Sequence, residues 1–230
     1  MREQDFRNEY KYLISDGELV LLRDRIKGIL PPDPHVGRDG QYAIRSLYFD
    51  DYANRCYYEN ENGTEPREKF RIRIYNGSRE TITLECKRKE HGLTQKSACR
   101  LSEAQCRLLM AGRYPPDFAG QPPLLQKLST EMMERRMHPV VIVEYRRAPY
   151  LYPPGNVRIT FDTQIAASSD IDGFLDASVP LRPIMPAGQQ LLEVKFDGFL
   201  PGYIRQLLQL ESLQQTAFSK YYLCRKFLWR

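Results

Sequence analysis

Residues 69–75 read KFRIRIY, a run in which apolar and basic side chains alternate. Successive side chains of a β-strand point to opposite faces, so residues two apart share a face. Phe70 and Ile72 therefore lie on one face, and Arg71 and Arg73 lie on the other. This stretch predicts a strand with one apolar face and one basic face.

The same alternation recurs along the chain. Residues 82–89 read ITLECKRK, residues 157–162 read VRITFD, and residues 191–196 read LLEVKF. Bases and an occasional acid alternate there with apolar residues, which is typical of a strand packed on one face. Strands are predicted over residues 5–14, 41–50, 68–76, 80–90, 94–101, 139–150, 156–166 and 188–197.

Helices are fewer than strands. Ser15 predicts the N-cap of a helix over 16–29, with Glu18 at the capping-box position, and Ser102 predicts the cap of a helix over 103–111. Apolar residues at helical spacing predict further helices over residues 123–137, 202–210 and 218–228. The Pro-rich spots are short and indicate turns. We therefore expect one α+β domain, residues 1–230, dominated by antiparallel strands.

Composition limits the class of protein. The chain has 230 residues, 42% of them hydrophobic, and no apolar run reaches the length of a membrane span. The N-terminus lacks the apolar core of a secretory signal, and five cysteines without CxxC spacing indicate free thiols. We expect a cytoplasmic protein. Its net charge is only +5, so the positions of its bases matter more than their sum.

The charged strand faces allow two interpretations. Half-solvated antiparallel sheets alternate in this way routinely, which would make these faces ordinary surface. Arg and Lys dominate them, however, and like charges on neighbouring strands repel each other. A bound polyanion would compensate that cost. In this second interpretation the apolar faces lie outward beneath the helices, and the charged faces line a basic tunnel.

The residue types on these faces suit phosphate chemistry. Guanidinium groups match pairs of phosphate oxygens, and ammonium groups add point charge. Scattered glutamates are oxygen ligands of the kind that Mg²⁺ and Mn²⁺ prefer. The sequence has no P-loop pattern, and His35, His91 and His138 show no metal-ligand spacing. The pattern predicts a site for a linear chain of phosphates.

Eight short motifs make the sequence similar to a known family. They are residues 6–12 (FRNEYKY), 46–50 (SLYFD), 69–75 (KFRIRIY), 84–89 (LECKRK), 143–147 (VEYRR), 158–162 (RITFD), 192–196 (LEVKF) and 218–221 (FSKY). In this order they resemble the VTC domain, the polyphosphate polymerase domain of the vacuolar transporter chaperone complex. That domain is one of the CYTH-like triphosphate tunnel metalloenzymes. The motifs extend over nearly the whole chain.

The resemblance implies an eight-stranded antiparallel β-barrel, the triphosphate tunnel, with flanking helices. It implies that Glu193 binds the metal ion, Mn²⁺ or Mg²⁺, and that Glu9 and Glu85 pair with neighbouring bases or reach the metal. Lys220, near the transferred phosphate, would be catalytic together with Arg71 and Arg73. The phosphate-binding residues that it implies are Lys11, Arg71, Arg73, Lys87, Lys89, Tyr145, Arg147, Arg158 and Lys195.

The resemblance also implies an activity, transfer of the γ-phosphate of ATP to a growing polyphosphate chain. ATP and polyphosphate are then the expected partners, and nucleic acid is not. Three alternatives stay open: a metal-dependent triphosphatase, a non-catalytic polyphosphate-binding module, and a nucleic-acid-binding module. The chain departs from the family where Arg7 replaces a glutamate and where bases are absent near Asn60 and at Ala217. These departures bear on substrate choice.

Overall fold

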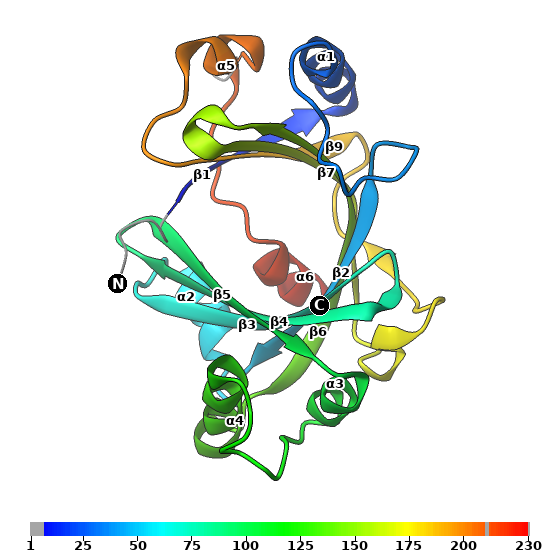
Figure 1. Ribbon diagram of the computed structural model, residues 1–230, viewed down its shortest axis with the longest axis vertical. Helices are drawn as coiled ribbons and strands as arrows, with labels where there is room; N and C mark the ends of the chain where they lie inside the picture. Colours follow the sequence, from blue (N-terminus) through cyan, green and yellow to red (C-terminus); the bar gives the residue numbers. More distant parts are fainter. Residues whose placement is uncertain (1–6, 210–211, 230) are drawn as a thin grey trace. The chain divides into compact units, whose positions relative to one another are not determined.

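The computed structural model describes residues 7–209 and 212–229. Asp5 and Phe6, where the first predicted strand begins, and Leu210, where a predicted helix ends, lie outside the described residues. Within the described part the chain is an antiparallel sheet with helices against it (Figure 1). No helix in that part is long and apolar enough to cross a membrane.

The main strands agree with the predicted ones to within about three residues at each end. They are β1 (Asn8–Ser15), β2 (Tyr42–Asp50), β3 (Arg67–Tyr75), β4 (Ser78–Glu90), β5 (Leu93–Leu101), β6 (His138–Tyr152), β7 (Val157–Ser168) and β9 (Gln189–Phe196). Their order in the sheet is β1-β9-β7-β6-β2-β3-β4-β5. The short strand β8 (Arg182–Pro183) was not predicted and pairs with β7. The α+β class with eight antiparallel strands and flanking helices is confirmed.

The chain divides into two compact units. Unit 1 contains the described residues of 1–43, 145–165 and 185–218, and unit 2 contains those of 44–144, 166–184 and 219–230. Strands β6 and β7 each contribute one end to unit 1 and the other end to unit 2. The expectation of a single domain over 1–230 stays a prediction.

In unit 1, helices cover the apolar face of the strands. Helices α1 (Asp16–Lys27) and α5 (Gly202–Leu207) lie beside each other over β1 and β9 (Figure 1). The capping box predicted for α1 is present, because the Ser15 hydroxyl accepts from Glu18 N and the Glu18 carboxylate accepts from Ser15 N. The core is formed by side chains such as Ile14, Ile26 and Val194, all 2% exposed or less.

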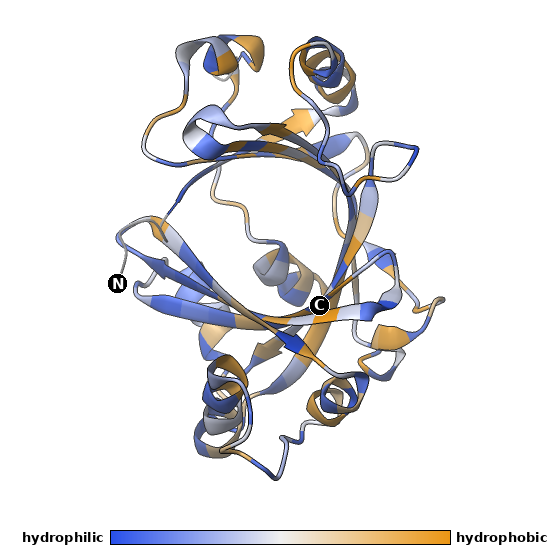
Figure 2. Cartoon of the chain, viewed as in Figure 1, coloured by the Kyte–Doolittle hydropathy of each residue, from blue (hydrophilic) through white to orange (hydrophobic). Residues whose placement is uncertain are grey.

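In unit 2, helices contact both faces of the sheet. Helices α3 (Glu103–Met110) and α4 (Pro123–Arg135) lie on one side of β3, β4 and β5, and α6 (Lys220–Leu228) lies on the other (Figure 1). Phe70 and Ile72 of β3 are buried on the α4 side. Hydrophilic and hydrophobic residues are both present along the strands and helices (Figure 2). This is expected of elements that bury one face and expose the other.

Several element boundaries differ from the predicted ones. Helix α6 begins at Lys220 rather than at 218 because Ser219 is its N-cap and accepts from Tyr222 N at 3.3 Å. Helix α4 ends at Arg135 because Arg136 adopts a left-handed conformation. Within residues 7–209 and 212–229, the helical elements that were not predicted include α2 (Arg55–Glu61), η2 (Pro154–Asn156) and η3 (Asp172–Leu175).

Candidate functional site

Three lysines form a row across the sheet of unit 2. Lys69 on β3 pairs in register with Lys87 on β4, and Lys87 pairs with Lys96 on β5. Side chains at paired positions point to the same face, and like charges placed directly opposite destabilise a sheet. The Lys69 ammonium donates to the Asn60 side chain, and Lys96 Nζ donates to Glu85 at 2.8 Å. This lysine row is a linear array of positive charge.

Glu85 holds the two predicted catalytic arginines beside that row. Its carboxylate accepts from Arg71 Nε at 2.8 Å, and Arg73 Nη1 lies 3.5 Å away. Glu85 is 2% exposed. Burial alone would raise the pKa of Glu85, but Arg71, Arg73 and Lys96 lower it well below its ordinary value. The carboxylate therefore stays charged and fixes both guanidinium groups.

The start of α6 lies against the same face. Lys220 is the first residue of this helix and is buried. Lys69 Nζ donates to Ser219 Oγ at 3.4 Å, next to Lys220 in the chain. The N-terminus of α6, which Lys220 begins, therefore lies against the face of the sheet that carries Lys69, Arg71 and Arg73.

Acids and bases alternate on the charged face of unit 1. Lys11 on β1 pairs in register with Glu193 on β9, and Glu9 pairs with Lys195. Lys195 Nζ lies 3.1 Å from Glu9 and 3.5 Å from Glu193, and Lys11 Nζ lies 3.4 Å from Glu9. Lys11 also donates to the carbonyl of Phe218 at 2.7 Å. Four residues singled out in the sequence therefore form one cluster.

Arg147 binds Glu193, the predicted metal ligand. Its guanidinium donates to both oxygens of Asp162 at 2.6 Å and to Glu193 at 3.1 Å, and it lies over the Tyr145 ring. Burial alone would lower the pKa of Arg147, but Asp162, Tyr145 and Glu193 raise it well above its ordinary value. Arg147 orients Glu193 in this structure, and the phosphate-binding roles of Arg147 and Tyr145 stay predictions.

The surroundings of Glu193 fit a divalent cation. Among the described residues, the buried hydroxyl of Thr160 has no hydrogen-bond partner, and Thr160 pairs in register with Glu193. It offers a second oxygen beside the carboxylate. Within residues 7–209 and 212–229 no three His, Cys, Asp or Glu side chains cluster as a complete metal site. One carboxylate completed by substrate oxygens and water is the usual protein environment of Mg²⁺.

Two predicted phosphate ligands are engaged by neighbouring side chains. Arg158 Nη2 donates to Asp33 and to the Tyr42 hydroxyl, both at 2.9 Å. Lys89 forms an ion pair with Glu65 at 2.8 Å. Each is held in place by a partner within its own unit, and their roles toward phosphate stay predictions.

Sequence reasoning missed Lys69 and Lys96. Lys69 precedes Arg71 by two residues, so the strand period already placed it on the basic face. Lys96 required the register of the β4–β5 hairpin, which pairs it with Lys87. The stretch around Asn60, where the family base is absent, supplies an amide oxygen to Lys69 instead.

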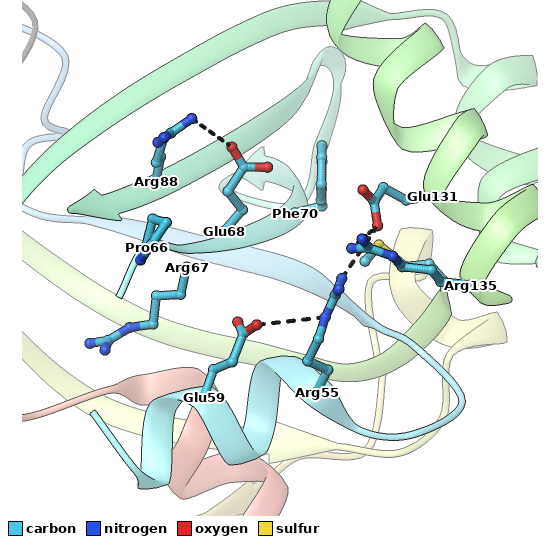
Figure 3. Close-up of a pocket in the computed structure, with 10 residues that line it drawn as sticks. Arg55, Glu59, Pro66, Arg67, Glu68, Phe70, Arg88, Glu131 and Arg135 are labelled. Atoms are coloured by element: carbon cyan, nitrogen blue, oxygen red, sulfur yellow. Dashed lines mark hydrogen bonds and ion pairs between the residues drawn. The ribbon is translucent and has the colours of Figure 1, made fainter. Parts of the chain in front are cut away.

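A small pocket in unit 2 lies apart from these clusters. It has a volume of about 210 Å³ and lies between α2, α4 and β3 (Figure 3). Its side chains Glu68 and Phe70 lie on the face of β3 opposite Arg71. Arg55 and Arg135 both pair with Glu131, at 3.4 and 3.0 Å (Figure 3). The pocket contains none of the site residues that the family resemblance implies, so it is not the candidate site.

Solved structures share the fold. A proposed adenylate cyclase from Bacillus halodurans has a TM-score of 0.56 at 15% identity, with 94% of each chain covered. A proposed adenylyl cyclase from Hippeastrum, described as having a dominant triphosphatase activity, has a TM-score of 0.54 at 16% identity over 96% of each chain. A protein from Pyrococcus horikoshii OT3 has a TM-score of 0.51 at 12% identity, over 97% of this chain and 99% of its own.

These likenesses concern the fold, because all three identities are low. They agree with the α+β fold, an antiparallel sheet with flanking helices, that the sequence predicted. The family model described as the VTC domain matches residues 6–229, which is nearly the full sequence. The chain therefore belongs to the VTC domain family.

Proposed function

We infer that this protein is a metal-dependent polyphosphate polymerase that transfers the γ-phosphate of ATP to a growing polyphosphate chain. The observation that carries this proposal is the lysine row Lys69, Lys87 and Lys96. Three like charges in register cost stability, and a linear phosphate chain neutralises them. Membership of the VTC domain family supports the same reading.

Phosphoryl transfer asks a protein mainly for positioning and charge neutralisation. Arg71 and Arg73, fixed by Glu85, would bind phosphate oxygens, and Lys220 would neutralise charge on the transferred group. In unit 1, the family resemblance implies that Lys11 and Lys195 bind phosphate. A Mn²⁺ or Mg²⁺ ion held by Glu193 would, when bound, neutralise phosphate oxygens.

A metal-dependent triphosphatase is the second candidate. The Hippeastrum protein of the same fold is described as a triphosphatase, and the same side chains serve attack by water. In hydrolysis, water attacks the γ-phosphorus, the bond to the bridging oxygen breaks, and ADP and free phosphate form. In synthesis, a terminal phosphate oxygen of polyphosphate attacks the γ-phosphorus, ADP leaves, and the chain grows by one unit. The two candidates differ in the attacking oxygen.

One incubation distinguishes the candidates. Purified protein is incubated with ATP and Mn²⁺, and in parallel with Mg²⁺, and samples go to a gel for long-chain polyphosphate and to a free-phosphate assay. Long chains with little free phosphate support the polymerase, and free phosphate without chains supports the triphosphatase. If neither product forms from ATP or tripolyphosphate, both enzyme candidates are wrong.

Variants connect the activity to the lysine row. Lys87→Ala removes the middle charge, and we expect turnover to fall at least about tenfold, since each charged contact to phosphate is worth on the order of 1.4 kcal/mol or more. Lys127→Ala is the matched control, because Lys127 lies on α4 and pairs with Glu68 on the other face of β3. Equal activity of both variants would contradict the proposal.

A further inference from the structure

The carboxylate of Asp50 connects three elements of unit 2. Asp50 ends β2 and is fully buried. Its oxygens accept from the backbone N–H groups of Asp51 at 2.9 Å, Cys56 at 2.8 Å and Tyr57 at 3.2 Å. The last two amides belong to the first turn of α2, so a strand residue caps this helix. A buried carboxylate that accepts several hydrogen bonds is held firmly in one position.

The same carboxylate accepts a hydrogen bond from the hydroxyl of Tyr221, the second residue of α6. Tyr221 is 2% exposed. Burial, reinforced by the charge of Asp50, raises the pKa of Tyr221 well above its ordinary value, so the phenol remains a donor. Asp50 thus fastens the first turn of α6.

The ring of Tyr221 reaches the basic face. It contacts the Tyr48 ring at a centroid distance of 5.3 Å, and the Tyr48 hydroxyl accepts from Arg71 Nη1 at 2.8 Å. Lys69 Nζ lies 5.2 Å from the centre of the Tyr221 ring. The Tyr221 side chain therefore connects Asp50 to Tyr48, which binds Arg71, and to Lys69 of the lysine row.

We propose that Asp50 and Tyr221 are positioning residues. They hold Lys220, the residue next to Tyr221, in place against the sheet face that carries Arg71 and the lysine row. The inference rests on the proposed function and deepens it. Lys220 begins a helix of nine residues, and the contacts that hold the first turn of this helix include the Ser219 cap, the buried Asp50–Tyr221 bond and the exposed Tyr222–Glu61 bond. Misplacement of a reacting group by about 1 Å can cost on the order of 100-fold in rate.

The proposal explains two sequence motifs together. Residues 46–50 (SLYFD) supply the carboxylate and the Tyr48 ring, and residues 218–221 (FSKY) supply the N-cap, the lysine and the phenol. The two motifs meet at the Asp50–Tyr221 hydrogen bond.

The test compares two adjacent tyrosines of α6. Tyr221→Phe removes one hydroxyl and keeps the ring packed. We expect kcat to fall about tenfold with the KM for ATP changed less than about twofold, because a misplaced Lys220 weakens the transition state more than ground-state binding. Tyr222→Phe is the control, since its hydroxyl bonds Glu61 and Lys226 rather than the basic face.

A second readout does not depend on activity. The protein is treated briefly with acetic anhydride, and acetylation of Lys220 is measured by mass spectrometry relative to exposed Lys127. We expect Lys220 acetylation to rise severalfold in Tyr221→Phe and to stay at the wild-type level in Tyr222→Phe. If wild type turns over no triphosphate, the proposed function fails while the labelling still decides the positioning role.

Two results would overturn the inference. One is a Tyr221→Phe variant with wild-type kcat and wild-type Lys220 labelling. The other is a variant whose melting temperature falls while kcat, measured well below that temperature, does not change, because the bond would then serve stability alone.

Discussion

At the residue scale, Glu85 makes a pH-dependent contribution to stability. Its folded-state pKa lies well below the unfolded value of about 4.3 because of Arg71, Arg73 and Lys96. A depressed folded pKa stabilises the protein above the unfolded pKa, and the contribution is lost as pH falls toward the folded value. We expect Glu85→Gln to be destabilised by on the order of 3 kcal/mol at pH 7, since buried Arg73 and half-buried Arg71 lose their partner.

The difference in the free energy of unfolding between wild type and Glu85→Gln should narrow as pH falls below about 4, because Glu85 of the unfolded chain becomes protonated there while the folded carboxylate still stays charged. Urea unfolding of both proteins at pH 7, 5, 4 and 3 measures this difference in the free energy of unfolding. Glu80→Gln, an exposed position on the same strand, is the control and should match wild type throughout. If the stability difference between wild type and Glu85→Gln does not change with pH, the charge of the Glu85 carboxylate is not the source of the stabilisation.

Glu193 should set the metal requirement. Glu193→Gln keeps the shape and removes the charged ligand, so we expect the Mn²⁺ or Mg²⁺ concentration for half-maximal activity to rise at least about tenfold. A metal titration of turnover measures this. Glu144→Gln, a half-buried glutamate paired with Arg45, is the control for general loss of a carboxylate. An unchanged metal requirement in Glu193→Gln would assign the metal elsewhere.

At the element scale, the caps account for which helices the sequence predicted. Ser15 and Ser102 carry complete capping boxes, and both helices were found from their start signals. Helix α2 was missed because its N-cap, Asn54, makes no side-chain cap and adopts φ 56°. Its cap comes from Asp50 on a preceding strand, which no local pattern reveals.

The candidate site likewise combines features that the local sequence predicts with features that depend on contacts between distant parts of the chain. The period of two placed Arg71, Arg73 and Lys87 on a basic face, and Figure 1 shows α6 on the side of the sheet away from α4. Cross-strand register, which sequence periodicity does not give, was needed to align Lys69, Lys87 and Lys96. Nor does periodicity show that Arg147 is bound to Asp162, because that pair depends on how two strands pack.

Helix α1 offers a test of the cap energetics. Ser15→Ala should destabilise the protein by about 1 kcal/mol, while Ser15→Gly should cost only a few tenths, since glycine leaves the amides open to water. Urea unfolding of both variants measures the difference. Equal losses in the two variants would show that the capping box contributes nothing specific.

At the scale of the whole molecule, ligand binding should raise stability. The net charge of +5 is mild, so any stabilisation by polyanions must come from local arrays such as the lysine row. Tripolyphosphate at about 100 times its Kd should add about 2.7 kcal/mol and raise the melting temperature by roughly 5–10 °C.

The shift should shrink as NaCl is raised toward about 1 M, where the screening length falls to about 3 Å. Melting curves with NaCl alone at matched ionic strength provide the control. A melting temperature unmoved by millimolar tripolyphosphate at low salt would count against polyanion binding as a whole.

The assembly of each unit from three separate stretches of sequence affects how the protein can fold during synthesis. Strand β1 pairs with β9, about 180 residues later in the chain, so β1 leaves the ribosome long before its partner has been made. Unit 2 likewise acquires α6 only after residue 219. A nascent chain released at residue 185 would lack strands or helices of both units, so we expect neither to resist protease until the last segments have emerged.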